Sequence, residues 1–291
     1  MPKIPYNEHG YFYDFRHITA DEISNYPNGI KDIQNRKLDG LIIKNFLNQN
    51  EVKTIIQSVE EQKSDIRTKV RTGYTFPRAF AEAERNITAE NPFENNFREW
   101  AEWRQKFPDI FNVDIEKKLN KIFEAMSGGR NVTILNGPSL IGSYTPLTIR
   151  VFHPKLGGIV VHCGNMFEEL NPNLYADLIS KVATKNQMSF FIQLQNSESG
   201  GELTIYDLEW KPGQMGISDS VIRLEDGREL DTDVEGSVKK FSLKIHPGDM
   251  LIFAAGEIWH RVENITGQSD RITVGGFLGF SNDDKFLTYW S

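Results

Sequence analysis

Apolar and polar positions recur with two different periods along this chain. Up to about residue 130 the spacing is helical: the range 50–62 places its apolar residues on one face, and 97–107 and 113–126 repeat the pattern. From residue 148 onward, short runs rich in β-branched and aromatic residues alternate with turns. The chain is therefore predicted to be α+β but mainly β, with a helical N-terminal half (1–130) and a jelly-roll core (131–291).

No internal repeat and no flexible linker marks a domain boundary, so a single domain over 1–291 is expected. Thr19 and Glu22 fit a capping box at the start of a short helix, Asn50 is a candidate cap for the next helix, and 39–46 (DGLIIKNF) is a candidate strand. The acidic range 211–240 interrupts the strands. Because it lacks EF-hand spacing, it is predicted to be a solvated insert rather than a calcium loop.

Composition excludes several classes of function. The net charge of -7 argues against non-specific binding to nucleic acid, which needs a basic surface. A single cysteine excludes an internal disulfide framework and a cysteine-based zinc site. The chain contains no apolar run of membrane-spanning length, and no basic start followed by an apolar run, so a cytoplasmic enzyme with no membrane partner is expected.

The strongest candidate chemistry lies in the strand-like range 158–164 (GIVVHCG). Non-haem iron oxygenases hold Fe(II) with two histidines and one carboxylate, and alternation along a strand places His162 and position 164 on the same face. Position 164 is glycine, so iron bound here would keep an open coordination site that a halide ion can fill. By the same alternation Cys163 faces away and is expected to be a small core residue.

Two later segments can complete such a site. His260, in the run IWHRV, is a candidate second iron ligand. Arg271 and Thr273 share one face of a following strand, and a guanidinium fork beside a hydroxyl suits the distal carboxylate of a bidentate keto acid.

Each assignment has a plain structural alternative. His162 taken alone fits a hydrogen-bonded core histidine, and Gly164 fits a bulge or a metal-free member of the same fold. A carboxylate from elsewhere could also replace the missing ligand, but none of the candidates stands two residues from His162. Those candidates are Glu168, Glu169, Glu202 and Asp249, the last in a Pro-Gly-Asp turn that local backbone bonding explains.

These segments resemble the freestanding aliphatic halogenases of the hapalindole and welwitindolinone type, which depend on iron(II) and 2-oxoglutarate. The matching blocks are 144–150 (YTPLTIR), 161–165 (VHCGN), 200–203 (GGEL), 206–210 (YDLEW), 275–278 (GGFL) and 289–291 (YWS). The resemblance runs from about Asp39 to the end and is weakest between Ser64 and Arg98. It implies a double-stranded β-helix (cupin-like) fold.

The resemblance also implies the cofactors and partners. Fe(II), 2-oxoglutarate, O2 and chloride or bromide would act on an unactivated sp3 carbon of a carrier-free small-molecule natural product. An iron-dependent hydroxylase or desaturase, and a non-catalytic binding protein on the same fold, remain the alternatives. The oligomeric state is not visible in the sequence.

Further candidate site residues follow from strand alternation and from the resemblance. Ser189 shares a strand face with Phe191 and Gln193 and is a candidate for donating a hydrogen bond near the oxo or halide ligand, although a polar residue at the mouth of a strand fits equally well. Asn165 is a candidate for contacting the halide or an iron ligand. Thr148 and Arg150 share a face and are candidates for binding 2-oxoglutarate, although Arg150 paired with Glu202 or Asp207 fits equally well.

The range 67–85, a candidate lid, departs most from the indole-alkaloid halogenases. It carries Arg67, Lys69, Arg71, Arg78, Glu82, Glu84 and Arg85. These charges indicate either a solvated lid surface or a substrate more polar than a terpenoid indole.

Overall fold

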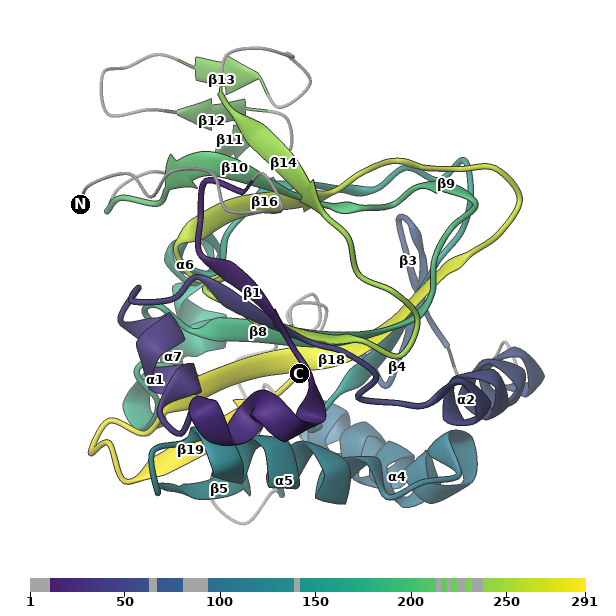
Figure 1. Ribbon diagram of the computed structural model, residues 1–291, viewed down its shortest axis with the longest axis horizontal. Helices are drawn as coiled ribbons and strands as arrows, with labels where there is room; N and C mark the ends of the chain where they lie inside the picture. The colour runs from purple at the N-terminus through teal and green to yellow at the C-terminus, as the bar shows by residue number, and fades with distance from the viewer. Residues whose placement is uncertain are drawn as a thin grey trace.

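The computed structural model describes residues 11–62, 67–80, 94–138, 142–212, 216–218, 221–223, 229–231 and 238–291, and two β-sheets dominate it (Figure 1). The larger sheet contains, in spatial order, β1 (Phe15–Ile18), β2 (Gly40–Ile43), β15 (Met250–Phe253), β8 (Met188–Gln195), β18 (Arg271–Phe280), β6 (Thr148–Phe152), β4 (Gly73–Phe76) and β3 (Thr68–Val70). On this sheet β19 (Phe286–Trp290) also pairs with β18, and β5 (Asn131–Ile134) pairs with β19.

The smaller sheet has the order β14 (Lys240–Leu243), β10 (Leu203–Glu209), β16 (Ile258–Val262) and β7 (Ile159–His162). A two-stranded ribbon of β9 (Ser199–Gly200) and β17 (Ile265–Thr266) extends it at one end. Apolar side chains from both sheets, such as Ile205 and Val274, belong to one buried cluster. This sandwich is the predicted jelly roll.

Helices cover the outer face of the larger sheet (Figure 1). They are η1 (Ala20–Asn25, a 3-10 helix), α1 (Gly29–Gln34), α2 (Gln49–Glu61), α4 (Glu94–Phe111) and α5 (Ile115–Met126). Phe123 of α5 packs edge-on against Phe190 of β8, with ring centroids 5.3 Å apart. The capping box at Thr19 and Glu22 is present, whereas α2 is capped by Asn48 rather than by Asn50.

The expected helical N-terminal half is not confirmed, because this part of the chain also supplies β1 to β4 of the larger sheet. The strand predicted at 39–46 forms as β2, and all four of its residues are buried between β1 and β15. Its continuous apolar run is typical of a strand buried on both faces.

The predicted insert 211–240 contains a small antiparallel sheet of its own. Its strands are β11 (Gly216–Ser218), β12 (Val221–Arg223) and β13 (Glu229–Asp231). The side chains of these strands and the loops between them lie outside the described residues, so the predicted solvated acidic surface is not tested.

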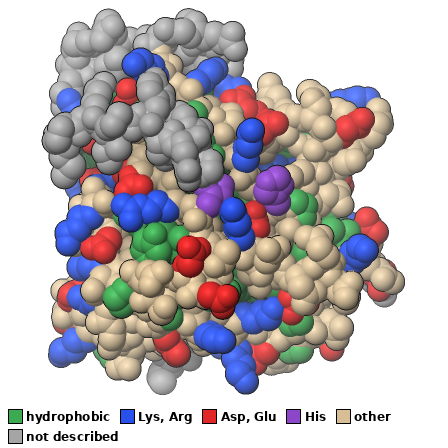
Figure 2. Space-filling view, in the orientation of Figure 1, with side chains coloured by type: hydrophobic (Ala, Val, Ile, Leu, Met, Phe, Trp, Pro, Cys, Tyr) green, Lys and Arg blue, Asp and Glu red, His purple; other side chains and the backbone are tan. Residues whose placement is uncertain are grey.

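Surface charge agrees with the charge balance of the sequence. Lys and Arg side chains are interspersed with Asp and Glu on the face shown in Figure 2, with no continuous basic patch among the residues described there. Within the described parts of the chain, no helix combines the length and the apolar composition that crossing a membrane requires.

Candidate active site

Two imidazole rings face each other across the smaller sheet. His162 ends β7 and pairs in register with His260 of β16, and their ring centroids lie 4.3 Å apart. In each ring Nδ1 is bonded to the backbone carbonyl two residues earlier: 2.7 Å to Val160 O and 2.8 Å to Ile258 O. Because a carbonyl only accepts, each Nδ1 carries the proton, and each Nε2 keeps its lone pair for a metal.

Both imidazoles are also held in the form that binds metal. Burial lowers the pKa of His162, and it lowers the pKa of His260 well below its ordinary value with a further contribution from neighbouring His162. Two neutral imidazoles with fixed tautomers and adjacent lone pairs are a suitable ligand pair for Fe(II).

The two histidines line a cavity of about 140 Å³ between the sheets. Four other predicted site residues line it as well: Arg150, Ser189, Arg271 and Thr273. Three do not line it: Thr148, Gly164 and Asn165. Most of the remaining wall is apolar and includes Phe152, Phe190, Phe191, Phe253 and Phe277.

The strand expected to carry both His162 and position 164 ends at His162, so that part of the sequence interpretation is wrong. Gly164 is instead the first residue of α6 (Gly164–Leu170). Its N–H donates to Ala255 O at 2.8 Å, and this bond to the loop before β16 turns the chain away from the sheet. Cys163, as expected, is buried.

A side chain at position 164 would start against Gln187. A Cβ added to Gly164 would lie 2.8 Å from Gln187 Nε2 and 3.1 Å from Gly256 Cα. Gln187 lies in the loop that follows α7 (Pro172–Lys181) and precedes β8, and nothing in the sequence interpretation singled it out.

No carboxylate replaces the one missing from position 164. In the described part of the chain, no third His, Cys, Asp or Glu gathers with the two histidines. Asp249 accepts hydrogen bonds from the backbone N–H groups of Asn45 (3.0 Å) and His246 (3.1 Å), which confirms its interpretation as a turn residue. Two imidazoles with no third His, Cys, Asp or Glu among the described residues therefore form the candidate metal site.

Arg271 and Thr273 stand at the start of β18, and both are buried. Burial, followed by the positive charge of Arg150, lowers the pKa of Arg271 to about 10, while Glu202 acts in the opposite direction. The guanidinium still carries its charge at neutral pH and lies 5.5 Å from the Phe191 ring centroid. A buried cation beside a second cation is stabilised by an anion, and the distal carboxylate of 2-oxoglutarate has the right charge and shape.

Two other candidates, Arg150 and Asn165, contact neighbouring parts of the fold around the site. Arg150 Nη1 and Nη2 lie 3.4 Å from Gly275 O and 3.5 Å from Ser291 Oγ, respectively. The amides of Asn165 and Asn186 are tied together: Asn165 Nδ2 donates to Asn186 Oδ1 at 3.2 Å, and Asn186 N donates to Asn165 Oδ1 at 3.0 Å. Asn165 thus holds α6 against the loop that carries Gln187.

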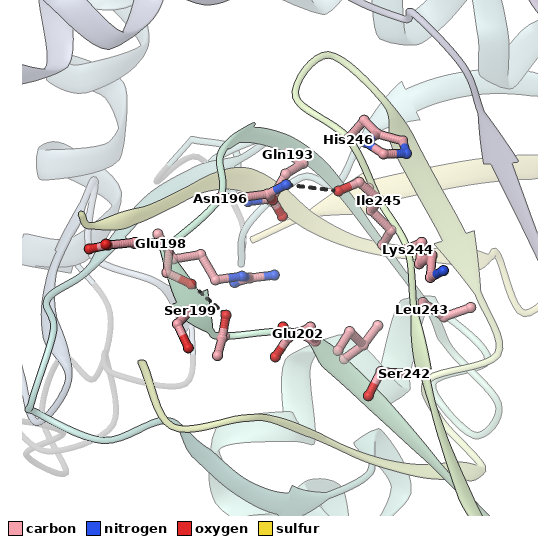
Figure 3. Close-up of a pocket in the computed structure, with 15 residues that line it drawn as sticks. Gln193, Asn196, Glu198, Ser199, Glu202, Ser242, Leu243, Lys244, Ile245 and His246 are labelled. Carbon is pink, nitrogen blue, oxygen red and sulfur yellow. Dashed lines mark hydrogen bonds between the residues drawn. The ribbon is translucent and has the colours of Figure 1, made fainter. Parts of the chain in front are cut away.

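A second cavity of about 430 Å³ adjoins the first (Figure 3). Gln193, Glu202 and Lys244 are among the side chains drawn around it, and Gln193 borders this cavity rather than the one that holds the histidines. Arg271 and Leu203 line both cavities. The buried guanidinium therefore forms part of the wall between them.

Three of the described charges of the candidate lid have structural partners, whereas Lys69 is exposed. Arg67 donates to Val59 O (2.8 Å) and Gln62 O (2.6 Å), Arg71 donates to Gly158 O (2.8 Å), and Arg78 forms an ion pair with Glu99 (3.5 Å). Positions 81–85 of the lid lie outside the described residues. These three arginines hold the fold together, which removes most of the reason to expect a polar substrate.

A comparison with protein families finds one match over residues 12–291, to the carrier-protein-independent halogenase WelO5 family. The chain belongs to this family. It is accordingly a non-haem iron, 2-oxoglutarate-dependent halogenase, with Fe(II), 2-oxoglutarate and O2 as its cofactors and halide as its additional substrate. A comparison with curated proteins finds no match.

Solved structures similar to this halogenase support the fold. An N-substituted L-amino acid dioxygenase from Burkholderia ambifaria AMMD has a TM-score of 0.53 at 14% identity, with 90% of each chain covered. The carbocyclase SnoK from nogalamycin biosynthesis has a TM-score of 0.50 at 14% identity, covering 94% of this chain and 90% of its own. The first is described as a dioxygenase and the second as a non-haem, alpha-ketoglutarate-dependent enzyme. At 14% identity, the similarity establishes the jelly-roll fold alone.

Proposed function

We propose that His162 and His260 bind Fe(II) through Nε2, that halide takes the coordination position beside Gly164, and that Arg271 with Thr273 binds the distal carboxylate of 2-oxoglutarate. The observation that carries this assignment is the imidazole pair, whose Nδ1 bonds leave both Nε2 atoms free where no carboxylate joins them. Iron with 2-oxoglutarate and O2 supplies the oxidant that removes a hydrogen atom from carbon, and the halide supplies the halogen.

The chain's own residues decide which group the carbon receives. A 100:1 preference for chlorine over hydroxyl needs only about 2.7 kcal/mol between the two barriers. Ser189 lies on the cavity wall, where its hydroxyl would be able to donate a hydrogen bond that disfavours transfer of hydroxyl to the substrate carbon. One such bond is worth about 1 kcal/mol, so substrate placement against the aromatic wall supplies the remainder.

The substrate is a freestanding small molecule, and we infer that it is largely apolar, with the attacked position an unactivated aliphatic carbon. Five phenylalanine rings line the cavity, and the described arginines of the lid are already paired within the fold. Arg150 also lines the wall and is not assigned to the iron or to 2-oxoglutarate. It suits one hydrogen-bond acceptor on an otherwise hydrocarbon substrate.

The test is an anaerobic titration of the metal-free protein with Fe(II) and 2-oxoglutarate, with and without chloride or bromide. The readout is the visible charge-transfer band of the iron–keto acid complex. A band that shifts with the halide supports halide on the iron. A band indifferent to halide would instead indicate a water-ligated oxygenase, and no band would contradict the iron and 2-oxoglutarate assignments.

A further inference from the structure

Gln187 is a buried amide whose polar atoms are not fully used. Its side chain is 1% exposed, and its Oε1 has no hydrogen-bond partner among the residues that the structure describes. A buried polar atom left unpaired costs about 1–3 kcal/mol, and in a native protein such an atom asks for an explanation. Oε1 is an acceptor that an anion cannot satisfy, so the unpaired atom indicates instead that no hydrogen bond within the described protein holds this amide in one orientation.

The amide stands where the missing iron ligand would begin. Gln187 Nε2 and Cγ lie 2.8 Å and 3.3 Å from the position that a Cβ on Gly164 would occupy. In an ordinary oxygenase that Cβ starts the carboxylate side chain. Gln187 therefore takes up space that a carboxylate would need in this strand-to-helix turn.

Three loops fix the backbone of Gln187 in this place. Its carbonyl accepts from Gly256 N at 2.8 Å, and its own N–H donates to Thr184 O at 3.0 Å. Gly256 itself admits no side chain, because a Cβ there would lie 2.7 Å from Gln187 O. The Asn165–Asn186 amide pair closes the arrangement from the side of α6.

An amide can present either end to a ligand, and the charge of the ligand selects which. Rotating the Gln187 amide by half a turn exchanges its N–H2 group with its carbonyl oxygen at little cost in shape. A halide attracts the N–H2 end and repels the carbonyl oxygen. Water can pair with either end, so a neutral amide tolerates both halide and water, whereas a carboxylate in the same place would repel halide.

From this geometry we propose that Gln187 is a halide-binding and specificity-determining residue, whose Nε2–H group donates to the halide that replaces the missing carboxylate at Gly164. The proposal rests on the function proposed above, in which halide lies beside Gly164. It assigns to this halogenase a second requirement besides the absent side chain: a neutral donor behind the vacant ligand position.

Two variants test the proposal by chloride titration of the anaerobic complex with Fe(II) and 2-oxoglutarate, read by the charge-transfer band. Gln187→Met keeps length and removes the donor, and Gln187→Glu keeps shape and introduces a negative charge. A hydrogen bond to a charged group is worth about 1.5–3 kcal/mol, so the chloride Kd of Gln187→Met should rise roughly tenfold or more. Gln187→Glu should lose the chloride shift.

The matched control is Gln57→Glu, the same chemical change on the exposed face of α2, where Gln57 bonds only Glu61. It should leave the chloride Kd unchanged. In each variant, the charge-transfer band shows that iron and 2-oxoglutarate are bound. If Gln187→Glu does not form this band, the chloride Kd of Gln187→Met alone tests the proposal. A wild-type chloride Kd in Gln187→Met overturns the role of Gln187, whereas a wild-type band that ignores chloride overturns the proposed function itself.

Discussion

Replacing Gly164 with aspartate would supply the carboxylate that ordinary iron oxygenases have, provided that Gln187 and the Gly256 backbone, 3.1 Å from the new Cβ, shift slightly. The backbone of Gly164 does not adopt the positive φ that would exclude other residues. The new Cβ would meet Gln187 Nε2, the far end of a flexible side chain, at 2.8 Å. Moving that side chain to an off-rotamer position costs about 0.5–1.5 kcal/mol. A carboxylate in the first turn of α6 returns about 0.3–1 kcal/mol, so Gly164→Asp should fold.

The loss of halogenation follows from competition for one coordination position. A carboxylate tethered two residues from His162 has an effective concentration of at least about 10 M, well below the values of rigid intramolecular pairs. At about 0.1 M chloride the carboxylate is favoured roughly 100-fold, which corresponds to about 2.7 kcal/mol. Gly164→Asp should therefore form the iron–keto acid band but lose its chloride shift, and chlorinated product should fall about 100-fold.

Gly164→Ala is the matched control, because it adds the Cβ against Gln187 without adding a ligand. It should keep a chloride shift, with a chloride Kd raised by less than about tenfold as Gln187 moves aside. Optical titration and product analysis by mass spectrometry give both readouts. Chlorination that survives in Gly164→Asp at the wild-type level would refute the open-site assignment. Loss of the shift in Gly164→Ala as well would mean that packing, not coordination, explains the effect.

Three further variants test other parts of the structure. Arg271→Lys replaces a planar fork with a point charge, so the Kd for 2-oxoglutarate should rise about 10- to 100-fold while Fe(II) binding persists; an unchanged Kd would remove Arg271 from the keto acid site. Ser189→Ala should lower the chlorination-to-hydroxylation ratio about fivefold, measured by product analysis, and an unaltered ratio would leave selectivity to the pocket shape. Asn48→Ala removes the cap of α2, because Asn48 Oδ1 accepts from Asn50 N and Glu51 N at 3.0 Å each. The free energy of unfolding should therefore fall by about 1 kcal/mol, and Tm by about 2 °C. A Tm equal to that of the wild-type protein would show that this cap contributes nothing.

The parts of the site that local periodicity controls were predictable from the sequence. Alternation along a strand places Arg271 and Thr273 on one face, and both line the cavity. The runs around His162 (GIVVHCG) and His260 (IWHRV) indicated the two histidines independently of the family resemblance, and the register of β7 and β16 places them opposite each other. That register depends on pairing between distant strands, so the sequence alone did not determine the 4.3 Å separation of their rings.

Long-range contacts explain what the sequence interpretation missed. The strand β7 ends at His162 because Gly164 N bonds to Ala255 O, a partner that strand alternation cannot reveal. Gln187 becomes important only where its loop meets the loop of Gly256 and the start of α6. One signal was available: two adjacent amides, Asn186 and Gln187, immediately precede the apolar strand β8. The strands β1, β3 and β4 were missed because each has only three or four residues and shows no clear period.

The charge balance of the site explains why a halide suits the proposed open position at Gly164 better than a neutral ligand such as water. An ordinary oxygenase site holds Fe(II) with two neutral imidazoles and one carboxylate of charge −1. Removing the carboxylate leaves the site one negative charge short, while Arg271 and Arg150 add positive charge inside the same cavity. A halide restores the missing charge without requiring any other group to change, whereas water does not. Among the described residues no carboxylate gathers with the histidine pair, and the side chain that faces Gly164 is the neutral amide of Gln187.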